Sequence, residues 1–153
     1  MTMLGRTDEE NDAGYLDIAS FICSNALKPV DELRELWKRI AFNILINNTE
    51  DHLQNHGFLL KKNGWELSPV YDINPIPYGD LLALRINEYD NRIDETNFLD
   101  TSRYYKLSKT DATSLYMEMK RIVRDNWEPI AGSYFISHAE IERMRPAFSL
   151  AET

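Results

Sequence analysis

The chain is 153 residues long, and 43% of these residues are hydrophobic and 27% charged. This mixture is ordinary for a globular domain and excludes collagen-like, coiled-coil and wholly disordered chains. With 17 basic and 25 acidic side chains the net charge is −8, a sign that argues against direct binding to nucleic-acid phosphates.

Nothing in the sequence indicates a membrane-spanning or exported protein. The longest apolar runs are only a few residues, far short of a membrane span, and no basic start followed by an apolar stretch marks a signal peptide. Cys23 is the only cysteine, so it can form neither an internal disulfide nor, by itself, a zinc site. Its apolar surroundings predict a buried structural thiol. We therefore expect a cytoplasmic protein.

Two helices are expected in the first third of the chain. Residues 1–13 are polar and acidic and predict a loose arm. From Gly14 onward apolar residues recur at helical spacing and predict the first helix. Pro29 separates it from a second helix, which begins near Asp31, a carboxylate suited to the positive end of a helix dipole. Its apolar stripe continues to about Asn48 and is the clearest helical pattern in the sequence.

The pattern changes after Thr49 to short runs and turn signals. The runs GFLLKK and NGWELSP flank Asn63-Gly64 and predict a small hairpin that turns at this pair. Residues 71–80 contain two prolines and a glycine and predict an ordered loop. Leu81 to Ile86 is a further candidate strand.

The last third returns to helical patterns. A short helix is expected between Thr96 and Tyr105. Ser108 is placed to cap a longer helix, whose end Pro129 should disturb. The capping box Ser137-His138-Ala139-Glu140 predicts a final helix towards Phe148.

The expected architecture is therefore one mainly α-helical domain over residues 1–153, with a small β-hairpin and loop insert at residues 50–86. This insert carries most of the polar residues that have no obvious packing role. Functional side chains commonly lie on loops that a rigid scaffold holds, so the insert is the candidate functional region.

Within the insert, an acid at Glu50 precedes Asn55 by five positions. In protein kinases an acid with this spacing orients the substrate hydroxyl and accepts its proton, and the asparagine binds Mg²⁺. A second acid, on a loop after a short hairpin, binds the metal that bridges the phosphates, and Asp72 has this place. Mg²⁺ prefers oxygen ligands, usually one or two carboxylates with phosphates and waters. The pattern indicates metal-dependent phosphoryl transfer.

Two segments make a family resemblance visible: NNTEDHLQNHGFLL at residues 47–60 and GWELSPVYDINPIP at residues 64–77. They closely resemble the C-terminal kinase region of HipA-type serine/threonine kinases, the toxins of bacterial toxin–antitoxin systems. The opening MTMLGRTDEENDAGYLDIASFI also resembles family sequence, so the resemblance covers most of residues 1–86. It implies a helical kinase C-lobe that uses ATP and Mg²⁺ to phosphorylate a protein substrate, and a HipB-like antitoxin as partner.

The resemblance also assigns individual positions. The catalytic aspartate of the family falls on Glu50, the metal-binding asparagine on Asn55 and the metal-binding aspartate on Asp72, while His52 matches the usual histidine of the motif. Glutamate is one methylene longer than aspartate, and positioning errors on the ångström scale are costly in catalysis. Asp51 is the alternative base, although it lies only four residues before Asn55.

The N-terminal features of the family are not recognisable in the sequence. Its six glycines are scattered instead of forming a phosphate-binding loop, and no lysine lies in a Val-Ala-Ile-Lys-like strand. We therefore expect one lobe of a kinase, either a fragment or a naturally shortened protein, without its N-terminal lobe. Such a lobe alone should bind ATP weakly and turn it over very slowly.

Other interpretations stay open. A pseudokinase or binding module would keep the fold without turnover, as the glutamate at position 50 suggests. A metal-dependent hydrolase would use Asp51, His52, His56 and Asp72, although no HExxH arrangement joins the two histidines. In the simplest case the segment is a solvated loop whose polar side chains satisfy backbone groups.

Overall fold

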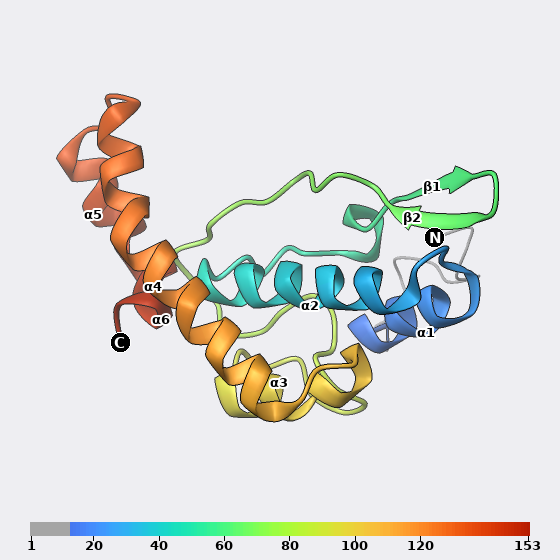
Figure 1. The fold of residues 1–153 in the computed structure, drawn as a ribbon. Coiled ribbons are helices and arrows are strands. Elements are labelled where there is room, and N and C mark those ends of the chain that lie inside the picture. The colour runs from blue at the N-terminus through green and yellow to red at the C-terminus, as the bar shows by residue number, and fades with distance from the viewer. Residues whose placement is uncertain (1–12) are drawn as a thin grey trace.

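The computed structural model describes residues 13–153. In chain order the elements are α1 (Tyr15–Asn25), α2 (Pro29–Leu45), η1 (Leu53–Asn55), β1 (Phe58–Lys61), β2 (Gly64–Leu67), α3 (Glu95–Asp100), η2 (Ser102–Tyr105), α4 (Lys109–Ser133), α5 (His138–Met144), η3 (Arg145–Phe148) and α6 (Ser149–Glu152). The prediction of a mainly helical domain with one small hairpin is confirmed (Figure 1). Of the arm predicted at residues 1–13, only Ala13 lies within the described residues, and it is buried.

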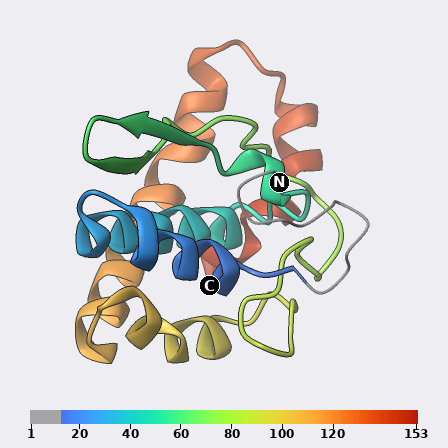
Figure 2. The ribbon, with the colours of Figure 1, turned by 90° about the vertical axis from the view of Figure 1, so that its right-hand side faces the viewer.

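Helix α2 forms the centre of the molecule. Pro29 is its first residue, where a missing N–H costs no intrahelical hydrogen bond. Leu36, Trp37 and Ile40 on its inner face are fully buried, and each such side chain contributes about 1.5–3 kcal/mol by leaving water. The Trp37 ring stacks on Phe98 of α3 with centroids 5.0 Å apart. Figure 2 shows α1 beside α2, with the hairpin on one side of the pair and α3 on the other.

Helix α1 buries one face and exposes the other. Tyr15, Ile18, Ala19 and Ile22 lie in the core as the sequence pattern predicted. Cys23 follows Ile22 by one position, about 100° around the helix, and therefore faces solvent. The prediction of a buried thiol was wrong, because the apolar composition of the stretch concealed the phase of the helix.

The hairpin forms where it was predicted, but its turn is shifted by one residue. Lys61 pairs with Gly64, so the two-residue turn is Lys62-Asn63 instead of Asn63-Gly64. Gly64 belongs to β2 because the strand passes close to the end of α1. A Cβ added there would lie 3.0 Å from the backbone nitrogen of Leu27, so only glycine allows this approach.

Residues 81–86 do not form the predicted strand. Leu81 makes a single bridge to Arg92, and Arg85 makes another to Gly14. The segment therefore changes partners over its length and builds no ladder. Leu82, Leu84 and Ile86 are nevertheless buried at alternate positions, as they would be in a strand with one buried face.

The C-terminal third follows the predicted caps more closely than the predicted helix ends. Ser108 caps α4, which runs through Pro129 to Ser133. Pro129 is exposed, so water can solvate the carbonyl group that loses its intrahelical partner. The Ser137–Glu140 capping box is confirmed at α5. Pro146 then interrupts the helical path, which continues as η3 and α6.

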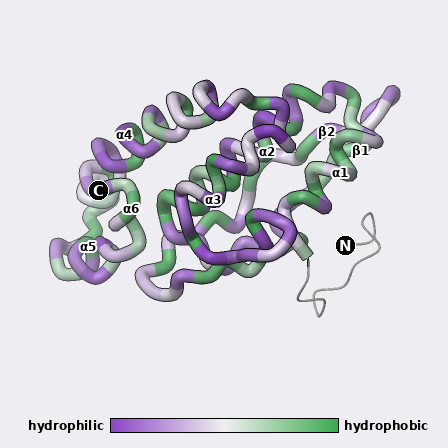
Figure 3. The backbone as a smooth tube through the Cα atoms, turned by 90° about the horizontal axis from the view of Figure 1, so that it is seen from below, coloured by the Kyte–Doolittle hydropathy of each residue, from purple (hydrophilic) through white to green (hydrophobic). Residues whose placement is uncertain are grey.

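Hydropathy follows the arrangement of the helices. Figure 3 shows hydrophobic residues over much of α1, while hydrophilic residues recur along α4. Helix α4 accordingly has only three buried residues, Ala112, Tyr116 and Val123. Between residues 13 and 153, no helix combines the length and the apolar composition that crossing a membrane requires.

Candidate functional site

The candidate residues lie on two loops, the first at residues 46–57 and the second at residues 68–80. The end of α2 joins these loops through Asn47, which has a left-handed backbone with φ of 51°. Its side-chain nitrogen lies 2.8, 3.1 and 3.2 Å from the carbonyl oxygens of Ile76, Tyr78 and Gly79. One amide therefore attaches the second loop to the start of the first.

A second group of contacts joins the middle of the two loops. The Tyr71 hydroxyl donates to the carbonyl oxygen of Gln54 at 2.6 Å. The Ser68 N–H donates to the carbonyl oxygen of Gly57 at 2.8 Å. A Cβ on Gly57 would lie 2.9 Å from the Ser68 hydroxyl and 3.2 Å from that of Tyr71, so glycine at this position allows the loops to touch.

Glu50 presents an open carboxylate. Its side chain is 71% exposed, and Oε2 lies 3.0 Å from Nε2 of His52. His52 is itself half-exposed, so the pair lies at the surface of the first loop. A carboxylate in this position can reach a hydroxyl group brought by another molecule, which is the geometric requirement for a general base.

Asp51 has the opposite environment, with a side chain only 3% exposed. Its Oδ2 accepts hydrogen bonds from the Tyr15 hydroxyl at 2.7 Å, the Asn43 amide at 2.7 Å and the His56 Nε2 at 3.0 Å. Burial, and then the negative charge and hydrogen bond of Asp51, raise the pKa of the Tyr15 hydroxyl well above its usual value. A buried carboxylate that several donors satisfy is suited to holding structure. Of the two carboxylates, only that of Glu50 is therefore open to another molecule.

Asn55 ends the 3₁₀ turn η1 and is buried. Its side-chain nitrogen donates to the carbonyl oxygen of Glu50 at 3.3 Å. With the nitrogen committed to this contact, the amide oxygen is the atom of Asn55 that can serve a cation. The same contact also ties the orientation of Asn55 to the backbone of Glu50.

Asp72 lies in the second loop, directly after the residue that contacts the first. It is exposed and has a left-handed backbone with φ of 56°. Its Oδ1 accepts a hydrogen bond from the Asn74 amide at 2.9 Å. Asn55 and Asp72 thus follow Gln54 and Tyr71, the two residues joined by the 2.6 Å hydrogen bond. Together they offer an amide oxygen and a carboxylate, a donor set that fits Mg²⁺.

The two histidines of the first loop serve different carboxylates. His52 contacts the exposed Glu50, and His56 contacts the buried Asp51. Within residues 13–153, no three His, Cys, Asp or Glu side chains gather in an arrangement that could hold a metal ion.

Tyr15 and Asn43 are the members of this region that sequence reasoning did not identify. Tyr15 is 36 residues from Asp51, so no local pattern connects the two. Asn43 did leave a signal, because it is a polar residue in register with the buried Leu36 and Ile40 of α2. A polar side chain on a core-facing helix position requires a buried hydrogen-bond partner.

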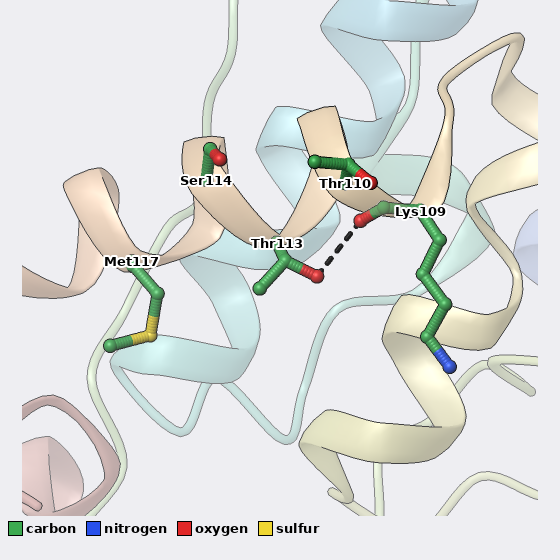
Figure 4. Close-up of a pocket in the computed structure, with 5 residues that line it drawn as sticks. All are labelled: Lys109, Thr110, Thr113, Ser114 and Met117. Atoms are coloured by element: carbon green, nitrogen blue, oxygen red, sulfur yellow. Dashed lines mark hydrogen bonds between the residues drawn. The ribbon is translucent and has the colours of Figure 1, made fainter.

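Surface hollows also lie away from Glu50, Asp51 and Asp72, and two of them bear on this part of the fold. An apolar hollow of about 360 Å³ is bounded by the end of α2, the second loop, α4 and α5. A shallow one lies on the first turns of α4, where the Thr113 hydroxyl donates to the Lys109 carbonyl oxygen at 2.8 Å (Figure 4). Neither hollow is lined by Glu50, Asn55 or Asp72.

Comparisons with known proteins identify the family and the fold. The profile of the HipA-like C-terminal domain family matches residues 1–127. A Haemophilus influenzae protein named "Putative kinase" is 33% identical over 76 residues, which cover 48% of this chain and 22% of that protein. A chain in the solved complex of the Shewanella oneidensis MR-1 toxin–antitoxin system, with HipA, HipB and operator DNA, has a TM-score of 0.74 at 17% identity. That match covers 92% of this chain and 35% of the other, and it shows the fold. Both relatives are considerably longer than the segment they share with this chain.

Proposed function

Because the chain belongs to the family of HipA-like C-terminal domains, we propose that it is the C-terminal catalytic lobe of a HipA-like protein serine/threonine kinase. It would take part in ATP- and Mg²⁺-dependent transfer of phosphate to the hydroxyl group of a protein. The observation that carries this proposal is the 2.6 Å hydrogen bond from Tyr71 to Gln54. It holds side by side the two loop segments that supply Asn55 and Asp72.

Glu50 is the proposed base. Its exposed carboxylate can accept the proton of the acceptor hydroxyl as the oxygen attacks phosphorus. His52 lies 3.0 Å away and restrains the direction of the glutamate side chain. The carbonyl group of Glu50 accepts the Asn55 hydrogen bond, so the base and the proposed metal ligand share one short stretch of backbone.

Asn55 and Asp72 are the proposed Mg²⁺ ligands. When bound, the cation would neutralise charge on the ATP phosphates. Two protein ligands rarely hold Mg²⁺ without phosphate oxygens, so binding of the metal should depend on nucleotide. Asn55 is restrained through Glu50 and Asp72 through Asn74, which reduces the entropy lost when the ligands are ordered.

The proposal includes partners that supply the rest of the enzyme. The glycine-rich loop and lysine that clamp phosphates in kinases would come from an N-terminal lobe, and this chain with that lobe is called the complete kinase below. The Shewanella relative was solved with HipB, which supports a HipB-like antitoxin as partner, and the proposed location of the kinase is the cytoplasm. The phosphate acceptor would be a separate protein.

One observation favours a second candidate, a pseudokinase that keeps the fold and has lost turnover. Glu50 replaces the aspartate that the family resemblance predicts at this position. The added methylene moves the carboxylate by about the distance that can cost 100-fold in rate. Its side chain is 71% exposed, so the contact with His52, and not packing, sets the position of the carboxylate.

A transfer assay separates the two candidates. The complete kinase should transfer radiolabelled phosphate from ATP to a protein hydroxyl in the presence of Mg²⁺, and chelation of the metal should abolish transfer. Residues 1–153 alone should show very little transfer. Absence of transfer with every protein acceptor, together with retained nucleotide binding, would establish the pseudokinase instead.

A further inference from the structure

We propose that Tyr15, Asn43 and His56 are positioning residues that hold the base and the metal ligand in place through the buried carboxylate of Asp51. This inference deepens the proposed function and rests on it. None of the three would contact the nucleotide or the acceptor. Their effect on the reaction would pass through the first loop.

The geometry places three donors from three parts of the fold on one oxygen atom. Tyr15 belongs to α1, Asn43 to α2 and His56 to the first loop itself. Their donor atoms lie 2.7, 2.7 and 3.0 Å from Oδ2 of Asp51. Distances from three directions fix an atom in space, so Asp51 attaches the first loop to both helices at a single point.

Asn43 also restrains the beginning of the first loop, through Asn48. The Asn43 side chain also accepts a hydrogen bond from the Asn48 amide at 3.1 Å. Its backbone carbonyl group accepts the Asn48 N–H at 2.8 Å. Asn43 thus restrains the loop both before and within the proposed catalytic segment.

The restraint reaches the proposed site through neighbouring backbone. Asp51 directly follows Glu50, whose carbonyl oxygen accepts the Asn55 side chain at 3.3 Å. A shift of Asp51 therefore moves the backbone of the base and the acceptor that orients the proposed metal ligand. Displacements of about 1 Å at a catalytic group can reduce the rate by about 100-fold.

Burial makes the restraint strong. Asp51 and His56 have side chains only 3% and 4% exposed, so water does not replace a donor that is removed. A buried carboxylate that loses one of its donors stays partly unsatisfied and shifts towards another arrangement. The Tyr15 ring also packs edge-on against His56 with centroids 5.8 Å apart, so removing its hydroxyl leaves the ring contact intact.

The first test is Tyr15→Phe in the complete kinase, with Tyr116→Phe as the matched control. Tyr116 is equally buried in the core but lies outside the Asp51 contacts. We expect Tyr15→Phe to lower kcat by about tenfold while KM for the protein acceptor changes less than about twofold, and Tyr116→Phe to leave kcat unchanged. An unchanged kcat for Tyr15→Phe, whatever its effect on stability, would show a purely structural role and overturn the inference.

The second test compares Asp51→Asn with Asp51→Ala. Asparagine keeps an oxygen that the three donors can share, whereas alanine keeps none. A positioning role predicts that Asp51→Asn retains more kcat than Asp51→Ala, which should lose about 100-fold. If both variants lose activity equally while Glu50→Gln is active, Asp51 is the base and the inference fails.

A measurement that needs no turnover distinguishes failure of this inference from failure of the proposed function. Hydrogen–deuterium exchange of residues 47–57 should speed up in Tyr15→Phe and stay unchanged in Tyr116→Phe, whether or not the protein transfers phosphate. Faster exchange in a protein that transfers no phosphate would contradict the kinase proposal alone. Unchanged exchange in Tyr15→Phe would contradict the positioning role.

Discussion

The side-chain nitrogen of Asn47 lies 2.8 Å from the carbonyl oxygen of Ile76, across 29 residues of sequence. This contact makes the segment directly after α2 the support for the second loop. It matters for the proposed site because Asp72 lies on the same loop, four residues before Ile76. A residue two positions after the end of α2 therefore also restrains the loop that carries a proposed metal ligand.

The first prediction concerns this support. Asn47→Gly keeps the left-handed backbone and removes the amide, and should lower the free energy of unfolding by about 1–2 kcal/mol through lost hydrogen bonds. Asn47→Ala should cost about 1–2 kcal/mol more, because alanine is strained at a φ of 51°. Chemical denaturation measures both values. A Gly variant as stable as the wild type would show that the amide contributes nothing.

The second prediction concerns Glu50 in the complete kinase. Glu50→Gln keeps the shape and removes the base, so kcat should fall by about 10²–10⁴-fold, while the Kd for nucleotide should change little. If the extra methylene misplaces the carboxylate, Glu50→Asp should raise kcat above that of the wild type. Steady-state kinetics give kcat for each variant, and nucleotide titration gives the Kd. A Glu50→Gln variant with full kcat would remove Glu50 from the mechanism.

The third prediction separates a metal ligand from a general charge effect. Asp72→Asn should weaken Mg²⁺·ATP binding as well as turnover, because a carboxylate ligand is replaced by a neutral one. Asp80→Asn is the matched control, since Asp80 is also exposed on the second loop and the change in charge is the same. Calorimetric titration with Mg²⁺·ATP gives both Kd values. Equal weakening by the two substitutions would point to long-range charge in place of ligation.

Several features of the fold follow from patterns only a few residues long. The capping box at Ser137 depends on one residue three positions later, and the sequence predicted it correctly. The apolar stripe of α2 likewise repeats within the helix itself. Local patterns of this kind are sufficient to predict the structure at those points.

Other features depend on contacts between distant segments. The hairpin turn moved to Lys62-Asn63 because Gly64 must pass close to α1, and no pattern within the hairpin records that approach. The tyrosine that satisfies Asp51 lies 36 residues away. The spacing of Glu50 and Asn55 made the first loop the candidate site, but it could not tell that the Asp51 side chain is buried and the Glu50 side chain exposed.

The fourth prediction concerns stability at high pH. The buried Tyr15 and Tyr105 hydroxyls have their pKa raised above the ordinary value, by burial first. The unfolded chain therefore loses these protons at lower pH than the folded chain. The stability they contribute is complete below about pH 10 and decreases as pH rises above that value. Tyr15→Phe should flatten the fall in unfolding free energy between about pH 10 and 11, as measured by denaturant titration, and an unchanged slope would contradict it.

The last prediction concerns the two glycines Gly57 and Gly132. A Cβ on Gly57 would lie 2.9 Å from the hydroxyl of Ser68 and 3.2 Å from that of Tyr71. These hydroxyls donate to the carbonyl oxygens of Pro69 and Gln54, so they can move only by weakening those bonds. Gly57→Ala should therefore cost about 1–2 kcal/mol of unfolding free energy and separate the two loops, with weaker Mg²⁺·ATP binding in the complete kinase.

Gly132→Ala is the contrasting substitution. It lies inside α4, and an added Cβ there meets no atom within 4 Å, so alanine should stabilise the helix by about 0.5–1 kcal/mol and leave nucleotide binding unchanged. Thermal and chemical unfolding of both variants, with nucleotide titration, tests the pair. If Gly57→Ala were as stable as the wild type and bound Mg²⁺·ATP equally well, the close contact between the loops would not be what holds Asn55 and Asp72 together.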